Sequence, residues 1–361
     1  MRSLIDIMNL STKEIDDLIE TAILITKNPS YYSDKCRGRT LANLFFEPST
    51  RTRMSIESAM YSLGGNVITM NDEGTSSAAK GESLQDTIRV VSSYADIVAI
   101  RHPNEGAALV ASLNSKVPVI NAGDGGHSHP TQTLADLLTI YREKERLKNL
   151  TIGFCGDLKY GRTVHSLINA LTRYEGIKIY LISPEELKLP DYVLEAIDSS
   201  GSDYIETTSL EDALPHLDIL YMTRIQKERF QDISAYERLK DSYILNNQNL
   251  VSAKKDMSIM HPLPRINEIS KEVDSDPRAC YFKQVVNGKL MRMALILKLL
   301  DEVKNNDGNE NRIELMNGIK DSSFKCKNPR CITHHERGLE QIYRIVDNKK
   351  HCIYCDSVSI I

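Results

Sequence analysis

The sequence predicts an α/β protein built from two parallel-sheet domains, followed by a small cysteine-rich domain at the C-terminus. Its 361 residues fit two domains of roughly 150 residues each, with room for a third. Apolar, strand-like runs alternate with helical patterns in two successive series, which is typical of parallel sheets with crossover helices. Four of the seven cysteines fall between residues 326 and 355, after a polar stretch with the composition of a linker.

The first series of elements occupies residues 1–145. Ser11 and Glu14 form a capping-box pattern ahead of an apolar helix, so folded structure begins near the N-terminus. The apolar run 41–46 indicates a strand, and the helix that follows it ends at the Gly64-Gly65 pair. Further strands are expected at 66–70, 96–101 and 117–121.

The second series occupies residues 146–287. Residues 288–303 form an apolar helix that we expect to pack back on the first domain, and 304–325 are expected to link it to the cysteine-rich domain at 326–361. Within the second series we expect a helix at 162–174 and strands at 151–155, 177–183, 217–222, 243–246 and 257–260.

Composition excludes several classes of function. The net charge is −4 and the lysines and arginines are dispersed, so we expect no nucleic-acid partner. No apolar run approaches the roughly 18 residues of a membrane span, and the N-terminus lacks a signal-peptide segment, so we expect no membrane association. These features together indicate a cytoplasmic protein.

The segment 45–53, Phe-Phe-Glu-Pro-Ser-Thr-Arg-Thr-Arg, is the most informative feature of the chain. It places three hydroxyls and the two guanidiniums of Arg51 and Arg53 where a strand gives way to a helix. A helix N-terminus has unsatisfied N–H groups and a partial positive charge, and an arginine fork adds to its affinity for a dianion. The segment therefore predicts a phosphate site, with a simple helix cap as the alternative.

Other polar residues follow strands, where ligands bind in open α/β sheets. Arg101 ends one strand, and His129 and Gln132 stand at the start of a helix. A histidine at that position tends to be neutral and able to donate one hydrogen bond to a carbonyl oxygen, although a plain helix cap is the alternative. The glycine-containing loop 156–162 lacks the G-x-G-x-x-G spacing, so a dinucleotide is not expected.

Arginines after the later strands suit a substrate with more than one carboxylate. Arg224 follows the strand at 217–222, and a His-Pro-Leu-Pro-Arg loop follows the strand at 257–260. The tract 75–82 holds one isolated lysine, Lys80, among small polar residues. An ordinary solvated loop is an equally good interpretation of that tract.

The cysteine tail predicts a structural zinc site. Its C-x4-C and C-x2-C pairs suit tetrahedral thiolate coordination, and a reducing cytoplasm disfavours two disulfides, which are the alternative. Such a short segment cannot build an adequate core alone, so the metal should supply most of the folding free energy of this zinc-ribbon-like domain. The four expected ligands are Cys326, Cys331, Cys352 and Cys355.

Residues 1–303 resemble the catalytic chains of aspartate carbamoyltransferases. The motifs that carry the resemblance occur in the family's order: Phe-x-Glu-Pro-Ser-Thr-Arg-Thr-Arg, Lys-Gly-Glu, Arg-His-Pro, His-Pro-Thr-Gln, Gly-Asp-Leu-Lys-Tyr-Gly-Arg, Thr-Arg-Ile-Gln-Lys-Glu-Arg and His-Pro-Leu-Pro-Arg. The resemblance implies condensation of carbamoyl phosphate with L-aspartate to give N-carbamoyl-L-aspartate and phosphate, in pyrimidine biosynthesis. It implies no cofactor for catalysis.

The resemblance also implies a role for each motif residue. Attack on the carbamoyl carbon builds negative charge on its oxygen, and Thr52, Arg101 and His129 resemble the donors that stabilise it. The remaining implied contacts are Ser49, Thr50 and Arg51 to phosphate; Gln132, Leu263 and Pro264 to the carbamoyl group; and Lys80, Arg162, Arg224 and Gln226 to aspartate. In the family Ser76 and Lys80 enter from an adjacent subunit, which implies a homotrimer that could pair into a dimer of trimers.

Two alternatives remain at this stage. An ornithine carbamoyltransferase-like enzyme shares the phosphate motif, but Arg224 and Gln226 favour a second carboxylate, and His-Pro-Leu-Pro stands where that relative carries a cysteine. A catalytically inactive scaffold could use the zinc ribbon to recruit a protein or RNA. The tail itself resembles the zinc domain of the family's regulatory chain, while residues 301–325 are too few to hold the nucleotide-binding domain of that chain.

Overall fold

The computed structural model describes residues 3–71, 81–225, 233–305, 317–346 and 348–359. The chain forms two compact units, and it passes from one to the other within helices α1, α6 and α11. The first unit comprises Met1–Leu10, Glu20–Thr131 and Arg292–Ile361, and the second comprises Ser11–Ile19 and Gln132–Met291.

The first unit contains a parallel four-stranded sheet with the order β2-β1-β3-β4. Its strands are β1 (Thr40–Phe45), β2 (Asn66–Asn71), β3 (Ile97–His102) and β4 (Val119–Asp124), and helices α3 (Thr50–Ser62), α4 (Leu84–Val91) and α5 (Ala107–Asn114) connect them. β1 and β3 are almost fully buried, as expected for central strands of a parallel sheet. The predicted parallel α/β architecture is confirmed, with strand ends shifted by at most three residues.

Short helical elements precede this sheet: η1 (Ile7–Asn9), α1 (Thr12–Lys27) and α2 (Pro29–Tyr32). The predicted capping box is present at the start of α1. The Ser11 N–H donates to Glu14 Oε2 at 2.9 Å, and the Glu14 N–H donates to Ser11 Oγ at 3.2 Å.

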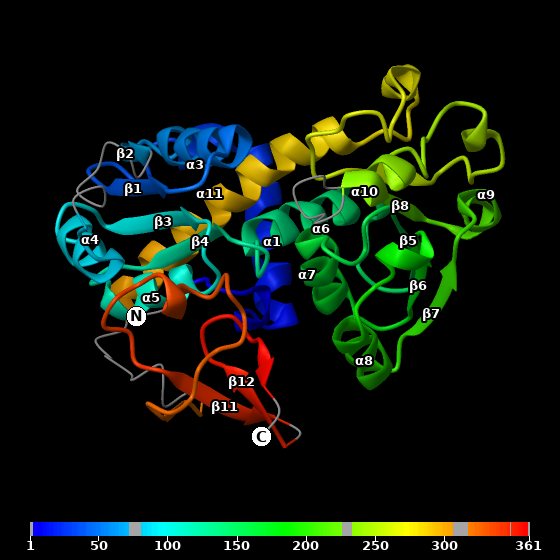
Figure 1. The fold of residues 1–361 in the computed structure, drawn as a ribbon. Helices are drawn as coiled ribbons and strands as arrows, with labels where there is room; N and C mark the ends of the chain where they lie inside the picture. Colours follow the sequence, from blue (N-terminus) through cyan, green and yellow to red (C-terminus); the bar gives the residue numbers. More distant parts are fainter. Residues whose placement is uncertain (1–2, 72–80, 226–232, 306–316, 347, 360–361) are drawn as a thin grey trace. The chain divides into compact units, whose positions relative to one another are not determined.

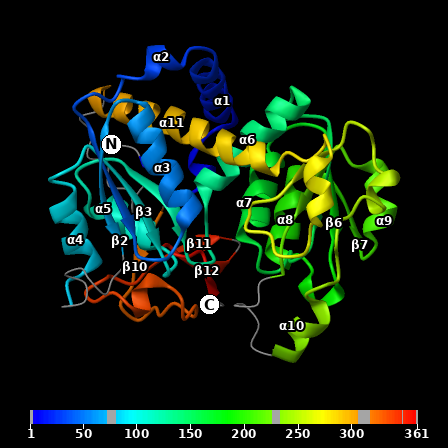
Figure 2. The same ribbon diagram turned by 90° about the horizontal axis from the view of Figure 1, so that it is seen from above.

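The second unit holds a parallel five-stranded sheet with the order β7-β6-β5-β8-β9. Its strands are β5 (Leu150–Cys155), β6 (Ile177–Ile182), β7 (Asp203–Thr207), β8 (Ile219–Met222) and β9 (Ser258–Met260). Helices α7 (Arg162–Leu171) and α8 (Asp191–Ser200) pack together beside it, as Figure 2 shows. The other helices are α6 (Pro130–Lys144), α9 (Leu210–Ala213) and α10 (Ile233–Leu239), with short turns η4 (Glu185–Leu187), η5 (Leu214–His216), η7 (Asn249–Val251) and η8 (Lys271–Ser275).

One predicted strand is wrong and one was missed. Residues 243–246 form no strand; only Leu245 makes an isolated bridge, to Ile269. The Asn246 side chain accepts hydrogen bonds from the N–H groups of Gln248 and Asn249, which turns the chain at that point. β7 was not predicted because its sequence is largely polar. It is an edge strand, paired only with β6, and several of its residues are exposed.

Helix α11 (Tyr281–Asn305) begins earlier than the predicted apolar helix, and its residues from Arg292 onward belong to the first unit. The linker predicted over 304–325 lies partly outside the described residues.

The C-terminal module begins with β10 (Ile319–Lys320) and continues through η9 (Ile332–His334), β11 (Ile342–Val346), β12 (Lys349–Cys352) and β13 (Val358–Ser359). These strands form an antiparallel sheet, and Figures 1 and 2 place the module beside α5 of the first unit.

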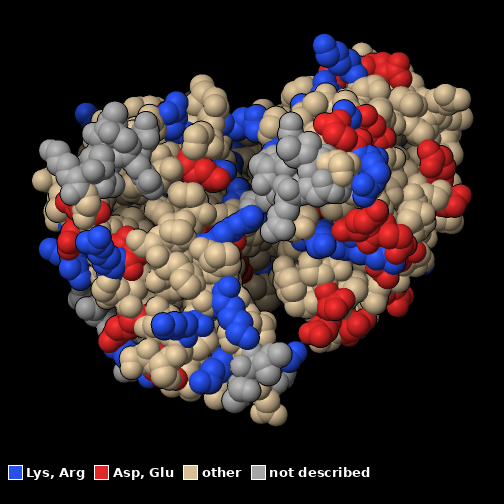
Figure 3. All heavy atoms as spheres, in the orientation of Figure 1, with Lys and Arg blue, Asp and Glu red and all other residues tan. Residues whose placement is uncertain are grey.

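Within the described ranges, no helix is long and apolar enough to cross a membrane. On the face drawn in Figure 3, lysine and arginine side chains are interspersed with aspartate and glutamate. Several of the basic side chains on that face gather over the C-terminal module, and the acidic ones gather mainly over the second unit.

Candidate active site and metal centre

The predicted phosphate segment lies where β1 leads into α3. Ser49 is the N-cap of α3, yet its side chain makes no capping hydrogen bond. Thr50 and Arg51 are exposed at the first turn of the 13-residue helix. Ser49 therefore does not act as a simple side-chain cap, and it stands at a helix N-terminus, a position that stabilises anions.

Thr52, Arg101 and His129 come together in the first unit from three different elements. Thr52 Oγ1 lies 3.5 Å from His129 Nε2. Gly123 lies between Arg101 and His129, with φ of +121°, and a Cβ added there would come within 2.9 Å of Arg101 Nη1 and 3.5 Å of His129 Cδ2. The close approach of the two side chains therefore requires glycine at this position.

Arg101 is held by Glu47, which belongs to the phosphate segment itself. Arg101 Nη2 lies 2.8 Å from Glu47 Oε2, and Nη1 donates to the carbonyl of Ala122 at 3.4 Å. Burial lowers the pKa of Arg101, and the ion pair with Glu47 opposes that shift. Glu47 fixes the direction of the guanidinium, a role that the sequence motif alone did not reveal.

His129 is supported from behind by Thr131 and Arg292. Thr131 Oγ1 lies 3.4 Å from His129 Nδ1, and Arg292 Nη2 donates to the same Oγ1 at 3.2 Å. Arg292 uses one lone pair of this oxygen, and when the Thr131 hydroxyl donates its proton to Nδ1 the ring is protonated on Nε2. His129 can then donate from Nε2, on the side where Thr52 lies. The sequence signal that could have pointed to Arg292 was an arginine inside an otherwise apolar helix.

In the second unit, the loops after β5 and β8 are fastened to each other. The Asp157 N–H donates to Thr223 Oγ1 at 3.0 Å, and Gly156, with φ of +120°, approaches Thr223 so closely that an added Cβ would lie 2.3 Å from its carbonyl oxygen. Arg162 begins α7 directly after the first of these loops, and Arg224 follows Thr223 in the second. Both arginines are half-buried at carboxyl ends of neighbouring strands.

The loop after β9 carries Leu263 and Pro264. Leu263 has φ of +53°, which is uncommon for a leucine, and the bond to Pro264 is cis. The Leu263 N–H donates to His261 Nδ1 at 2.8 Å, so the ring proton is on Nε2, which lies 2.7 Å from Glu268 Oε1. Burial lowers the pKa of His261 despite the opposing effect of Glu268. A neutral histidine therefore shapes this loop.

Gln132 lies in the first turn of α6, where its amide nitrogen donates to the buried Asp136. Three other predicted site residues, Ser76, Lys80 and Gln226, lie outside the described residues.

The four tail cysteines form a closed cluster. Their Sγ atoms all lie within 4.8 Å of one another, with Cys326 to Cys355 at 3.5 Å and Cys331 to Cys352 at 3.7 Å. Thiolates bound tetrahedrally to zinc at about 2.3 Å stand about 3.8 Å apart, whereas a disulfide requires about 2.05 Å. All four are buried and unpaired by disulfides, so the donor set fits a structural zinc ion, which supplies folding energy rather than chemistry.

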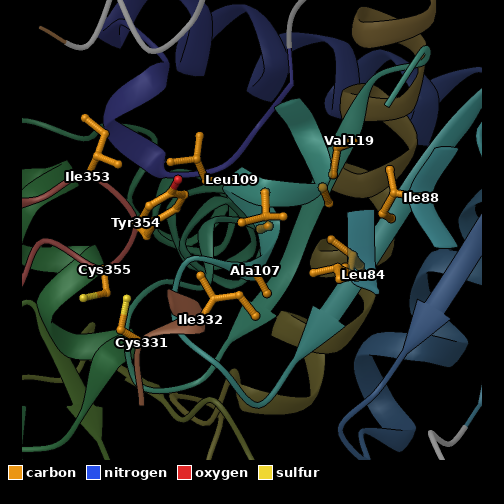
Figure 4. Close-up of a cluster of buried hydrophobic side chains, with 14 of the residues drawn as sticks. Leu84, Ile88, Ala107, Leu109, Val119, Cys331, Ile332, Ile353, Tyr354 and Cys355 are labelled. Atoms are coloured by element: carbon orange, nitrogen blue, oxygen red, sulfur yellow. The ribbon is translucent and has the colours of Figure 1, made fainter. Parts of the chain in front are cut away.

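The metal module shares a hydrophobic core with the first unit. Its apolar residues join those of α4, α5 and β4 in one cluster, and Figure 4 shows Tyr354 beside Leu109 and Ile332 beside Ala107. The main chain of Glu105 forms a bridge with the module, since its N–H donates to Arg330 O and its carbonyl accepts from Ile332 N, both at 2.9 Å. The module therefore packs on the chain to which it is attached.

A polar contact connects this module to the loop that precedes His129. His127 Nδ1 lies 3.3 Å from Asp124 Oδ2, and His127 Nε2 lies 3.2 Å from Asp356 Oδ2, next to the ligand Cys355. Burial alone would lower the pKa of His127, but the two carboxylates hold it well above its ordinary value. Asp124 also accepts hydrogen bonds from the N–H groups of Gly106 and Ser128.

Two parallel α/β units, one with a helix N-terminus suited to an anion and the other with arginines after neighbouring strands, fit a transferase that joins a phosphorylated donor to an acidic acceptor. Residues 2–142 match the model of the aspartate/ornithine carbamoyltransferase carbamoyl-P binding domain, and residues 148–299 match that of the Asp/Orn binding domain. The chain belongs to the aspartate/ornithine carbamoyltransferase family. Residues 316–359 match the metal binding domain of the aspartate carbamoyltransferase regulatory chain.

Relatives and solved structures agree with this assignment. The chain is 60% identical over 304 residues to the aspartate carbamoyltransferase catalytic subunit of Lachnoclostridium phytofermentans, which covers 84% of this chain and 99% of the relative. The aspartate transcarbamoylase catalytic subunit of M. jannaschii is 48% identical, with a TM-score of 0.80 over 85% of this chain and 100% of its own. The Trypanosoma cruzi enzyme in complex with carbamoyl phosphate and aspartate is 39% identical, with a TM-score of 0.78 over 82% and 96% of the two chains.

Proposed function

We propose that this chain transfers the carbamoyl group of carbamoyl phosphate to the amine of L-aspartate, giving N-carbamoyl-L-aspartate and phosphate for pyrimidine biosynthesis. The observation that carries the proposal is the convergence of Thr52, Arg101 and His129 beside the N-terminus of α3. The identity to aspartate carbamoyltransferase catalytic subunits supports the choice of substrates.

In the first unit, each group acts on the phosphorylated donor. Ser49, Thr50, Arg51 and the α3 N–H groups bind the phosphate, which departs without forming a bond to the protein. Attack by the amine puts negative charge on the carbamoyl oxygen, and Arg101, Thr52 and His129 Nε2 donate hydrogen bonds to that oxygen. Oriented donors of this kind stabilise the transition state more than the ground state.

The second unit binds the rest of the two substrates. Gln132 and the Leu263 carbonyl, in the loop completed by Pro264, accept hydrogen bonds from the carbamoyl amino group. Arg162 and Arg224 bind the aspartate carboxylates, with Gln226 and Lys80 completing the set. Ser76 and Lys80 enter from an adjacent subunit, so the active form is a cytoplasmic homotrimer, and separated subunits are nearly inactive.

Binding of N-(phosphonacetyl)-L-aspartic acid tests this assignment, since that compound is bound in a related Trypanosoma cruzi structure. We expect calorimetry to find one site per chain, weakened by at least about 100-fold in Arg101→Ala. The surface variant Lys116→Ala, at a position between α5 and β4, should bind normally. Equal affinities in the three proteins would refute the assigned site.

The zinc module serves as a clamp on its own chain and adds stability without a nucleotide response. The shared core and the Glu105 main-chain bridge support this role. We expect titration with CTP or ATP to leave aspartate saturation unchanged, because no nucleotide-binding domain separates α11 from the module. Saturable binding of either nucleotide, with a shifted aspartate curve, would contradict the proposal.

A further inference from the structure

Asp136 is a fully buried carboxylate on α6, one turn beyond Gln132. Its Oδ1 accepts hydrogen bonds from Gln132 Nε2 at 2.7 Å and from Gln284 Nε2 at 2.5 Å, and its Oδ2 accepts one from Tyr221 OH at 2.9 Å. A buried carboxylate surrounded by oriented donors stays fixed, because each of its bonds would be costly to break.

The bond from Gln132 decides which atom of its amide is left for a ligand. Because the amide nitrogen donates one of its two hydrogens to a carboxylate, which can only accept, the orientation of the amide is set, and its oxygen remains an acceptor that Gln132 can offer to a substrate. An oxygen accepts a hydrogen bond from an amino group and offers nothing to a methyl group.

A second branch runs from Asp136 to the Leu263 loop. The amide nitrogen of Gln284 donates a hydrogen bond to Asp136 Oδ1, and its amide oxygen accepts one from the His261 main-chain N–H at 3.1 Å. His261 Nδ1 in turn accepts the N–H of Leu263 at 2.8 Å. This chain of bonds holds the N–H of Leu263, the residue that supplies the carbonyl and whose φ of +53° requires such support.

We infer that Asp136 is a positioning residue that sets specificity for the amino group of the donor substrate, by orienting both acceptors of that group. The inference rests on the proposed function. One carboxylate fixes Gln132 directly and the Leu263 carbonyl through Gln284 and His261. Acetyl phosphate, which has a methyl group in place of the amino group, should gain nothing from Asp136.

The experiment compares the KM for carbamoyl phosphate with the inhibition constant for acetyl phosphate in four proteins. We expect Asp136→Ala to raise the KM about 10- to 100-fold and to leave the inhibition constant within about twofold, because only the amino-group contacts are lost. Asp136→Asn should restore most of the selectivity, since its amide oxygen can replace Oδ1. Tyr221→Phe, which leaves both glutamine bonds in place, should behave as wild type.

Equal losses for both compounds in Asp136→Ala would assign the residue a structural role only and overturn the inference. If Asp136→Ala fails to fold, a comparison of the selectivity of Gln284→Leu with that of Tyr221→Phe decides the same question. Gln284→Leu breaks the branch that leads to Leu263, whereas Tyr221→Phe leaves both glutamine branches in place. Equal selectivity in those two variants would also overturn it. A wild-type protein that forms no carbamoyl aspartate would instead refute the proposed function.

Discussion

Gly106→Ala should weaken the docking of the zinc module on the first unit. Gly106 has φ of +90°, and a Cβ at this position would lie 2.5 Å from Tyr354 Cβ and 2.7 Å from the Tyr354 carbonyl oxygen. The left-handed conformation costs alanine about 1–2 kcal/mol, and overpacking a close contact costs a further 1–3 kcal/mol. Since the obstructing atoms are partly backbone, the module has to shift.

Gly338→Ala is a matched control within the module, because Gly338 also has a positive φ, +75°, but nothing lies within 4 Å of the added Cβ. It should show only the conformational cost. We expect urea unfolding and the rate of zinc release to a chelating dye to show a loss about 1–3 kcal/mol larger in Gly106→Ala than in Gly338→Ala. Equal effects in the two variants would refute the cis docking of the module.

Three further predictions follow from the site and the module. Gly123→Ala should lower kcat/KM at least about 100-fold, because its Cβ would meet Arg101 Nη1 at 2.9 Å; unchanged steady-state kinetics would contradict the assigned site. Zinc removal by a chelator should lower the thermal midpoint of the first unit, because module and unit share one core, and an unshifted scanning-calorimetry transition would exclude that coupling. The pKa of His127 is raised because the ring lies between Asp124 and Asp356, and Asp356 is also paired with Arg344. The contribution of His127 to docking is therefore fully present below its unfolded pKa, about 6.5, and is lost as pH rises through its folded pKa. The pH dependence of zinc release should flatten in His127→Gln.

Periodicity and spacing predicted the two parallel sheets because their central strands are apolar and buried, as in β1 and β3. The same reasoning failed where local polar chemistry decides the structure. Asn246 turns an apolar run that resembles a strand, and β7 forms because a neighbouring edge is available to pair with it. Neither effect appears in the hydrophobic pattern.

The candidate site shows a similar division. The residues proposed to meet a ligand directly stand within sequence motifs, so Ser49, Arg101 and His129 were candidates from the sequence alone. Their supports could not, because Glu47, Asp136 and Arg292 act through contacts that only the tertiary structure creates. The cysteine spacing predicted the zinc ligands, whereas docking of the module through Glu105 depends on residues far apart in sequence.

Product formation from carbamoyl phosphate with L-aspartate and, in parallel, with L-ornithine tests the central claim most directly. The zinc-replete protein should form N-carbamoyl-L-aspartate, with no turnover of ornithine, because Arg162 and Arg224 provide cations for a second carboxylate. Carbamoyl ornithine as the product would contradict the assignment of those arginines. Absence of both products would contradict the account of the catalytic site and favour a scaffold.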